Sequence, residues 1–259
     1  MAIGDVVSRE DEIRILIFAS VFVLAAAWEL FASRRVASLS RVQRWSTNLG
    51  MLVLGIGAIR VLLPMTLITL ADWVASFEWG MIGFLDLPFV ISVALAVVAL
   101  DFCVYVQHVV MHRVSWLWRL HRVHHADAEF DVTTGLRFHP FEIIVSTLYK
   151  AMAVLVLGPP ALAVLIFEIV LNSSSMLTHA NGRLPQRLDQ VIRWLFVTPD
   201  MHRIHHSVEV GELNTNFGFN LAIWDRLFGT YRQRAALECA QIEVGLQLQP
   251  EKASSLRSA

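Results

Sequence analysis

Long runs of apolar residues alternate with short polar stretches along this chain. Three runs, at about 13–33, 48–71 and 89–111, are long enough to cross a bilayer, which takes about 20 mostly apolar residues. A fourth run, at about 142–177, is too long for one crossing and contains Gly158-Pro159-Pro160, which a helix does not tolerate in its middle. The pattern predicts an all-α membrane bundle of three spans and a helical hairpin, which either crosses twice or re-enters from one side.

Composition agrees with a membrane location. Hydrophobic residues make up 56% of the chain and charged residues 17%, whereas soluble domains carry about a quarter charged residues. The length of 259 residues suits a single domain. A net charge of -1 argues against a nucleic-acid partner, because nucleic-acid binding needs a basic face. Two cysteines are too few for a disulfide framework.

The loop charges predict an orientation. The loop after the first span contains Arg34, Arg35, Arg41 and Arg44, whereas the loop at 73–88 contains Glu78 and Asp86 and no Lys or Arg. Because cytoplasmic loops are enriched in Lys and Arg, the first loop is predicted to be cytoplasmic. Segments at about 113–141 and 178–235 then form a cytoplasmic cap, and every histidine motif lies at or beyond the cytoplasmic end of a helix. The polar tail at about 250–259 is expected to be flexible.

Two charged residues fall inside the predicted spans, where an isolated charge is expensive. They are Arg60 and Asp101. We hypothesise that they form a pair; the alternative is that each finds its own polar neighbour or a water molecule.

Eight of the ten histidines fall into three motifs, which are His108-Val-Val-Met-His112, His121-Arg-Val-His124-His125 and His202-Arg-Ile-His205-His206. Histidines three and four positions apart project from one side of a helix, so the second and third motifs are each predicted to offer three rings to one point. The two rings of the first motif suit either two ligands to one metal or one ligand to each of two metals. Unliganded rings this close would repel one another when protonated, whereas neutral imidazole binds Fe, Zn, Cu and Ni. Eight imidazoles exceed the needs of one metal ion, and we therefore predict a two-metal site.

The two remaining histidines are also candidates. His179 follows the hairpin and is expected to be a ligand, while His139, before Pro140, is either a ligand or an outer hydrogen-bond donor. Asp127 follows the second motif and either orients an imidazole N–H or is a solvated loop charge. Tyr105 lies one turn before His108 and belongs either beside the ligands or in the core.

These motifs occur in a specific order together with other short phrases. Asp101 and Tyr105 precede the first motif, and the further phrases are His179-Ala-Asn-Gly-Arg-Leu-Pro185, Thr198-Pro-Asp-Met-His-Arg-Ile-His-His-Ser207, Asn216-Phe-Gly218 and Trp224-Asp-Arg-Leu-Phe-Gly-Thr230. Over about residues 95–235 the chain resembles the fatty acid hydroxylase / sterol desaturase superfamily of membrane di-iron oxygenases.

The resemblance implies two iron ions bound by the histidines, dioxygen as co-substrate, and hydroxylation or desaturation of a sterol, acyl chain, ether lipid or carotenoid. It also implies a separate electron donor, a reductase with a ferredoxin- or cytochrome-type carrier. Asp101, Tyr105 and Asp127 are expected around the ligands. Some fatty-acyl hydroxylases have a further histidine where this chain has Ser175, and His139 is a possible substitute. Zinc is expected to compete for the same imidazoles during purification.

Two other functions fit a histidine-rich membrane protein. A zinc hydrolase usually places a general base beside its ligands, as in H-E-x-x-H, but the residues inside these motifs are Val, Met, Arg and Ile. A metal-ion transporter usually binds its ion near the bilayer midplane, whereas these motifs lie at the predicted cytoplasmic edge. Both remain alternatives to the oxygenase.

Overall fold

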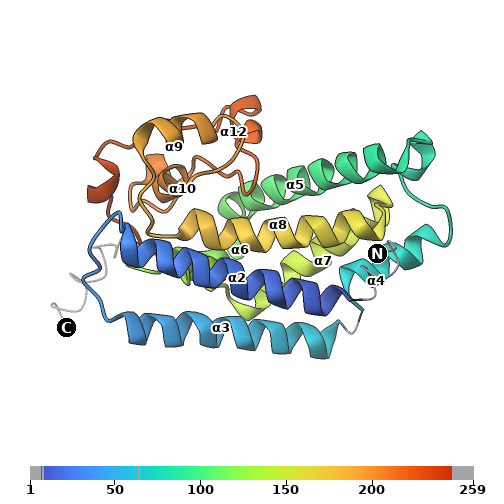
Figure 1. Ribbon diagram of the computed structural model, residues 1–259, viewed down its shortest axis with the longest axis horizontal. Coiled ribbons are helices and arrows are strands. Elements are labelled where there is room, and N and C mark those ends of the chain that lie inside the picture. Colours follow the sequence, from blue (N-terminus) through green and yellow to red (C-terminus); the bar gives the residue numbers. More distant parts are fainter. Residues whose placement is uncertain (1–6, 8, 64, 247–259) are drawn as a thin grey trace, which may run out of the picture.

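The computed structural model describes residues 7, 9–63 and 65–246, and the predicted tail at 250–259 lies outside them. Within the described residues β-structure is limited to isolated bridges, so the predicted all-α class is confirmed (Figure 1). The α-helices are α2 (Glu10–Phe31), α3 (Arg41–Leu62), α4 (Leu67–Ala75), α5 (Phe89–Arg113), α6 (Ser115–His125), α7 (Pro140–Leu157), α8 (Ala161–His179), α9 (Gln186–Ile192), α10 (Pro199–His205), α11 (Val210–Leu213) and α12 (Ile223–Leu227).

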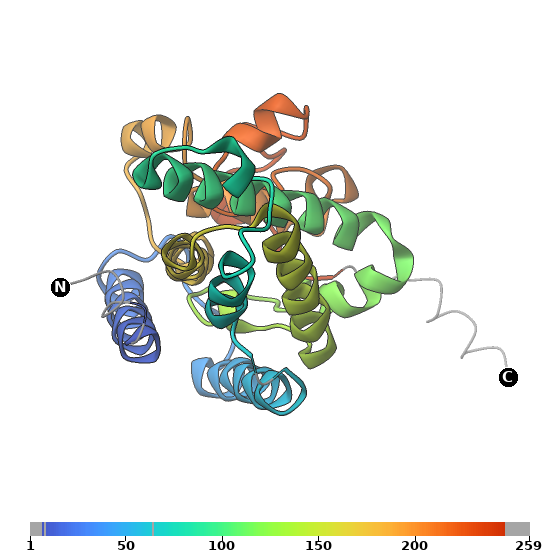
Figure 2. The same ribbon diagram turned by 90° about the vertical axis from the view of Figure 1, so that its right-hand side faces the viewer.

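Five helical segments are long and apolar enough to cross a membrane: Glu10–Phe31, Arg41–Ala75, Phe89–Arg113, Pro140–Leu157 and Ala161–His179. The fourth apolar run is thus two helices, α7 and α8, as predicted from the Gly-Pro-Pro break. Gly158 between them has a φ of +58°, which a glycine adopts without strain. The two arms are splayed, because α4 and α5 each pack against both α7 and α8 (Figure 2).

The second span differs from the prediction of 48–71. Ser40 caps α3 by accepting a hydrogen bond from Gln43 N, and Thr66 caps α4 in the same way from Thr69 N. The helix therefore begins at Arg41, ends at Leu62, and is followed by a second, shorter helix. The apolar run alone did not reveal this start, because the first turns of α3 are polar.

The shifted boundary explains why the hypothesis of an Arg60–Asp101 pair is wrong. Arg60 lies in the last turn of α3, where its guanidinium contacts the exposed carboxylate of Asp11 at 3.3 Å. Asp101 lies in the middle of α5 and accepts hydrogen bonds from Asn220 and Trp224, each at 2.7 Å. Each charge therefore has its own polar partner, which was the alternative.

The core lies between the helices, and the outside of the bundle is apolar. Leu67, Leu100, Val154 and Phe167 are among the buried residues that join α4, α5, α7 and α8. Outward-facing residues include many large apolar side chains, such as Val90 on α5, which is 78% exposed. A continuous apolar exterior of this kind is the surface expected against lipid. The chain is an integral membrane protein.

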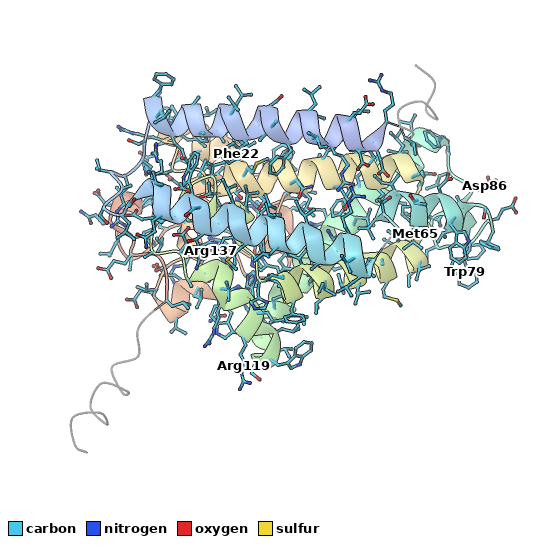
Figure 3. All side chains as sticks on the ribbon, turned by 90° about the horizontal axis from the view of Figure 1, so that it is seen from below. Phe22, Met65, Trp79, Asp86, Arg119 and Arg137 are labelled. Atoms are coloured by element: carbon cyan, nitrogen blue, oxygen red, sulfur yellow. The ribbon has the colours of Figure 1, made fainter. Side chains whose placement is uncertain are left out.

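The histidine motifs lie at one end of the bundle. His108 and His112 are near the end of α5, and His179 is the last residue of α8. Figure 3 shows Arg137, which belongs to the loop between α6 and α7, near this end, with Trp79 and Asp86 at the opposite end. The bundle thus separates the histidines from the α4–α5 loop.

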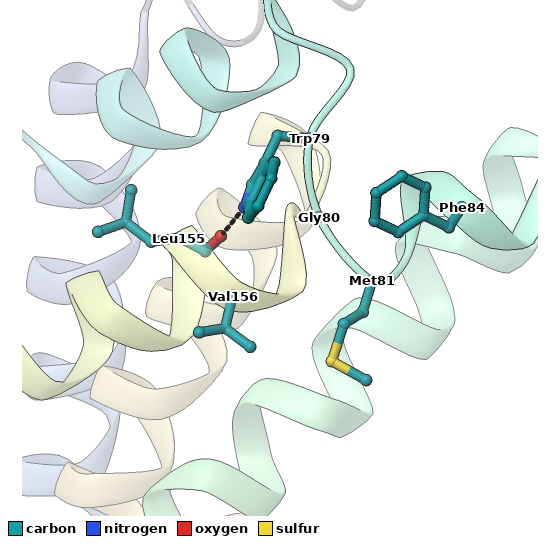
Figure 4. A pocket seen from close by; sticks show the side chains of 6 residues that line it. All are labelled: Trp79, Gly80, Met81, Phe84, Leu155 and Val156. Carbon is teal, nitrogen blue, oxygen red and sulfur yellow. Dashed lines mark hydrogen bonds between the residues drawn. The ribbon is translucent and has the colours of Figure 1, made fainter.

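At that opposite end the α4–α5 loop is fastened to the α7–α8 turn. Trp79 Nε1 donates to Leu155 O at 2.9 Å, and Ile82 N donates to Leu157 O at 2.9 Å. Gly80 lies against Gly158 so closely that a Cβ on Gly80 would be 2.3 Å from the Cα of Gly158. A small apolar pocket at this junction is lined by Trp79, Gly80, Met81, Phe84, Leu155 and Val156 (Figure 4). It lies far from the histidines.

Replacing Gly158 by alanine is expected to destabilise the fold. The new Cβ would lie 2.2 Å from Trp79 O and the backbone would keep a positive φ, which together cost about 1–3 kcal/mol. Gly57→Ala in α3 is the matched control, because a Cβ there meets nothing within 4 Å. Thermal unfolding in detergent should show a lower midpoint for Gly158→Ala only. An unchanged midpoint would mean that the junction adjusts without strain.

Candidate metal centre

Nine histidines form two adjacent groups near the C-terminal ends of α5 and α8. In each group the candidate ligand atoms lie within 4.8 Å of one another. The five-histidine group contains His108, His112, His121, His125 and His205, and the four-histidine group contains His124, His179, His202 and His206. Two groups agree with the predicted two-metal site.

The second and third motifs each divide between the two groups, which corrects the expectation that each of these two motifs offers its rings to a single point. A helix turns about 100° per residue, so positions i and i+4 are about 40° apart, while i+3 points about 100° away from i+4. His121 and His125 therefore stay together and His124 turns to the other group. By the same geometry, His202 and His206 stay together and His205 faces the five-histidine group.

Helix boundaries bring the motifs together. At Val114 the backbone leaves the helical conformation (φ -95°, ψ 115°), so α6 turns away from α5 and returns its histidines towards His108. Thr198 caps α10 by accepting a hydrogen bond from Met201 N, and Pro199 occupies the first turn, where proline is favoured.

The four-histidine group has the spacing of a metal site. His179 Nε2 lies 3.0 Å from the Nε2 atoms of His124 and His202 and 3.1 Å from that of His206. A ring nitrogen carries at most one proton, so hydrogen bonds cannot satisfy all these contacts. Four nitrogens at about 2.1 Å from one ion in a tetrahedron lie about 3.4 Å apart, close to the observed spacing.

The five-histidine group has buried nitrogens that need a partner. Among the described residues, Nε2 of His112, His121 and His205 and both ring nitrogens of His125 are buried and make no hydrogen bond. Leaving such atoms unpaired is costly, and a bound metal ion removes the cost. The residues of both groups therefore fit metal ions.

Five of the rings are oriented through Nδ1–H. The acceptors are Phe217 O for His108, Glu142 Oε1 for His121, Arg137 O for His124, Ser175 O for His179 and Thr215 O for His205, at 2.6–3.2 Å. A proton fixed on Nδ1 leaves the Nε2 lone pair free for a metal. Glu142 was missed in the sequence; its only signal was a carboxylate in the first turn of a helix that follows His139-Pro140.

Burial also keeps these rings neutral. It lowers the pKa of His205 to about 3. Burial and the neighbouring rings hold the pKa values of His124, His125, His202 and His206 well below the usual 6.5. Neutral imidazole is the form that binds metal ions.

His139 lies outside both groups. Its Nδ1 accepts a hydrogen bond from Phe141 N at 3.2 Å and caps α7. The structure thus does not bring His139 to the metal centre, because the proline that follows it starts a helix there. Ser175, at the position of the missing histidine, donates to Gly135 O at 2.7 Å.

The other expected residues act at a distance from the rings. Asp127 contacts Arg44, Asn48 and Thr134 and none of the histidines. Tyr105 contacts Thr230 through its hydroxyl at 3.0 Å. Asp101 holds the segment that contains Asn220 and Trp224.

Asp225 is a second carboxylate that holds the segment containing Phe217 and Asn220. Asp225 accepts from Phe217 N at 2.8 Å and from Gly218 N at 2.7 Å. Asp101 and Asp225 together fix the loop whose carbonyl, at Phe217, orients His108. In the Trp224-Asp225-Arg226 phrase, the buried Asp225 therefore has a structural role.

Comparison with known proteins places this geometry in a family. A family model described as "Fatty acid hydroxylase" matches residues 93–230, which is more than half of the chain. The chain belongs to the fatty acid hydroxylase family. The match runs from residue 93, within α5, to residue 230, after α12, and so includes all the histidines of both groups.

Individual relatives are lipid-modifying enzymes. An ornithine lipid hydroxylase of Rhizobium tropici is 34% identical over 144 residues, 56% of this chain and 43% of the relative. Human alkylglycerol monooxygenase is 28% identical over 52% of this chain and 29% of the relative, and human cholesterol 25-hydroxylase is 27% identical over 49% and 46%. The chain spans less than half the length of these relatives. No solved structure matches it.

Proposed function

We propose that this chain is a membrane oxygenase that binds two iron ions and hydroxylates a C–H bond of a lipid, with desaturation as the alternative outcome. The observation that carries the proposal is the pair of adjacent all-histidine groups, four and five rings, at one end of the bundle. Two such groups suit two metal ions rather than one.

The residues of this chain would hold and orient the metal ions. They offer no acid or base that could act on an alkyl C–H bond. Bound iron would supply the reduction of dioxygen that such a bond requires. Neither group includes a carboxylate, and Glu142 is already hydrogen-bonded to His121. This weighs against a zinc hydrolase, which needs a free general base beside the metal.

The surface of the cap supports a lipid substrate. Val191, Trp194, Leu227 and Phe228 are all exposed. Phe228 stacks on Phe102 of α5 at 5.6 Å between ring centroids, so the apolar surface of α9 and α12 continues the lipid-facing side of α5. A lipid can reach the histidine end of the bundle without leaving an apolar environment.

Charge supports a cytoplasmic metal centre. Exposed arginines near the histidines include Arg41, Arg113, Arg119, Arg122 and Arg183. At the other end Arg9 and Arg60 are exposed, and they contact Glu12 and Asp11, while Asp72, Glu78 and Asp86 are exposed there as well. By the positive-inside tendency the histidine end faces the cytoplasm. A separate ferredoxin- or cytochrome-type carrier would then deliver electrons there.

Lipid analysis tests the proposal. Lipid extracts from cells with and without the protein are compared by mass spectrometry, with ornithine lipids, ether lipids and sterols included because the relatives are named for such lipids. We expect a product heavier by one oxygen atom, or lighter by two hydrogens for desaturation. Metal-dependent uptake into vesicles without lipid oxidation would favour the transporter.

Iron removal should abolish activity. We expect purified protein to contain some zinc, since zinc competes well for imidazole, and expect that ferrous iron alone restores oxygen consumption with lipid and an electron donor. The measurement is turnover after chelation and reloading with Fe²⁺ or Zn²⁺. Activity that persists after complete iron removal would refute the di-iron proposal.

A further inference from the structure

We infer that Arg44 and Asn48 of α3 are positioning residues for the four-histidine group, although both precede the family match at residues 93–230. The inference rests on the proposed metal binding. It adds a role for a helix that contains no histidine. The connection runs through the loop at 126–139, which joins α6 to α7.

Arg44 donates hydrogen bonds to this loop from all three of its guanidinium nitrogens. Its Nε and Nη2 donate to the two carboxylate oxygens of Asp127 at 2.8 and 2.9 Å, and Nη1 donates to Asp131 Oδ2 at 2.6 Å. The three side chains are only 4–10% exposed. A bidentate arginine–carboxylate pair fixes orientation as well as distance. Arg44 therefore sets where the loop starts.

Asn48, one turn later on α3, is fully buried and holds the middle and end of the loop. Its Nδ2 donates to Asp127 Oδ2 at 3.0 Å and to Thr133 Oγ1 at 2.9 Å. Its Oδ1 accepts from Arg137 Nη1 at 2.9 Å. The amide thus uses both donors and its acceptor, so no other side chain of this size reproduces its contacts.

The far end of the loop contacts the four-histidine group directly. Arg137 Nε donates to Val123 O at 2.8 Å, and the Arg137 carbonyl accepts from His124 Nδ1 at 3.2 Å. Gly135 lies so close that a Cβ there would be 2.4 Å from Ser175 O and 3.2 Å from His179 Nδ1. A shift of the loop would therefore move the hydrogen-bond partner of His124 and crowd the ring of His179.

The five-histidine group has separate supports. Its oriented rings bond to Phe217 O, Glu142 and Thr215 O, which belong to α7 and to the segment after α10. Weakening the hydrogen bonds from α3 to the loop at 126–139 should accordingly affect only the metal position of the four-histidine group. A general loss of stability would instead weaken metal binding at both positions.

The test measures metal binding by the full-length protein in detergent. Arg44→Met, Arg44→Lys and Asn48→Leu are titrated with Zn²⁺, a redox-inert stand-in for iron, and bound metal is counted by mass spectrometry. We expect the wild type to bind about two ions, and Arg44→Met and Asn48→Leu to weaken one of them by about 10–100-fold, the usual effect of losing an outer hydrogen-bond partner. Arg44→Lys keeps the charge and should weaken it less.

Double variants show which position is affected. Arg44→Met combined with His202→Ala should bind as much metal as His202→Ala alone, because both act on the four-histidine group. Combined with His112→Ala, it should weaken binding at both metal positions. Arg193→Gln is the matched control: Arg193 is a buried arginine that pairs with Asp189 and contacts no histidine. It should lower stability without favouring one metal position.

Three results would overturn the inference: unchanged binding in Arg44→Met and Asn48→Leu, equal weakening of both ions, or further loss when Arg44→Met is added to His202→Ala. If Arg44→Met does not fold, Asn48→Leu and Arg44→Lys decide in the same titration. A wild type that binds two ions but oxidises no lipid would contradict the proposed function and leave this inference standing.

Discussion

His124→Ala and His205→Ala should each abolish lipid oxidation and release metal. His124 belongs to the four-histidine group and His205 to the five-histidine group, and each ring is oriented by a backbone carbonyl. Loss of an outer hydrogen-bond partner already costs about 10–100-fold in metal affinity or activity, so loss of a ligand should cost at least about 100-fold. Because both metal positions are required, the two variants should be equally inactive although they act on different groups.

His139→Ala is the matched control for these variants. It removes the same kind of side chain from a neighbouring position, but His139 caps α7 and belongs to neither group. We expect full metal content and a loss of about 1 kcal/mol in stability, the usual value of a helix cap. Turnover and bound iron are measured for all three variants. Full activity in His124→Ala or His205→Ala would count against the site, and metal loss in His139→Ala would restore His139 as a ligand.

The sequence predicted those features that depend on local patterns. Apolar runs located α2, α5 and the α7–α8 pair, since a helix that crosses lipid must be apolar along about 20 residues. The three histidine motifs identified eight of the nine clustered rings, and His179 was the ninth.

Features that depend on packing between distant segments were not predictable. Helix geometry explains why the second and third motifs each divide, but which histidines of α6 and α10 share a group depends on how the two helices face each other, and their sequences do not give that arrangement. The sequence suggested a partner for Asp101 on α3, but the segment at 220–224, which includes the start of α12, folds back onto α5 and donates hydrogen bonds to this carboxylate. The sequence placed Arg44 in a cytoplasmic loop. In the structure it lies at the start of α3, and its side chain is only 10% exposed and forms a buried ion pair with Asp127.

Glu142→Gln is expected to weaken metal binding by the five-histidine group alone. Glu142 Oε1 accepts from His121 Nδ1 at 2.6 Å, and Oε2 is buried without a hydrogen-bond partner among the described residues. The other oriented rings bond to neutral carbonyls, so His121 is the ring whose basicity a carboxylate increases. Glutamine keeps the shape and an acceptor oxygen but removes the charge. We expect about 10–100-fold weaker binding of one ion, measured by titration and by turnover.

Two comparisons separate charge from packing in this prediction. Glu168→Gln changes a carboxylate that is similarly buried, 7% exposed against 4% for Glu142, but it pairs with Arg14 and contacts no histidine. It should lower stability and leave the affinity for both ions unchanged. Adding Arg44→Met to Glu142→Gln should weaken both ions, because the two residues support different groups. If Glu142→Gln binds both ions normally while Glu142→Leu does not, the side chain matters for packing and hydrogen bonding, and its negative charge has no part in metal binding.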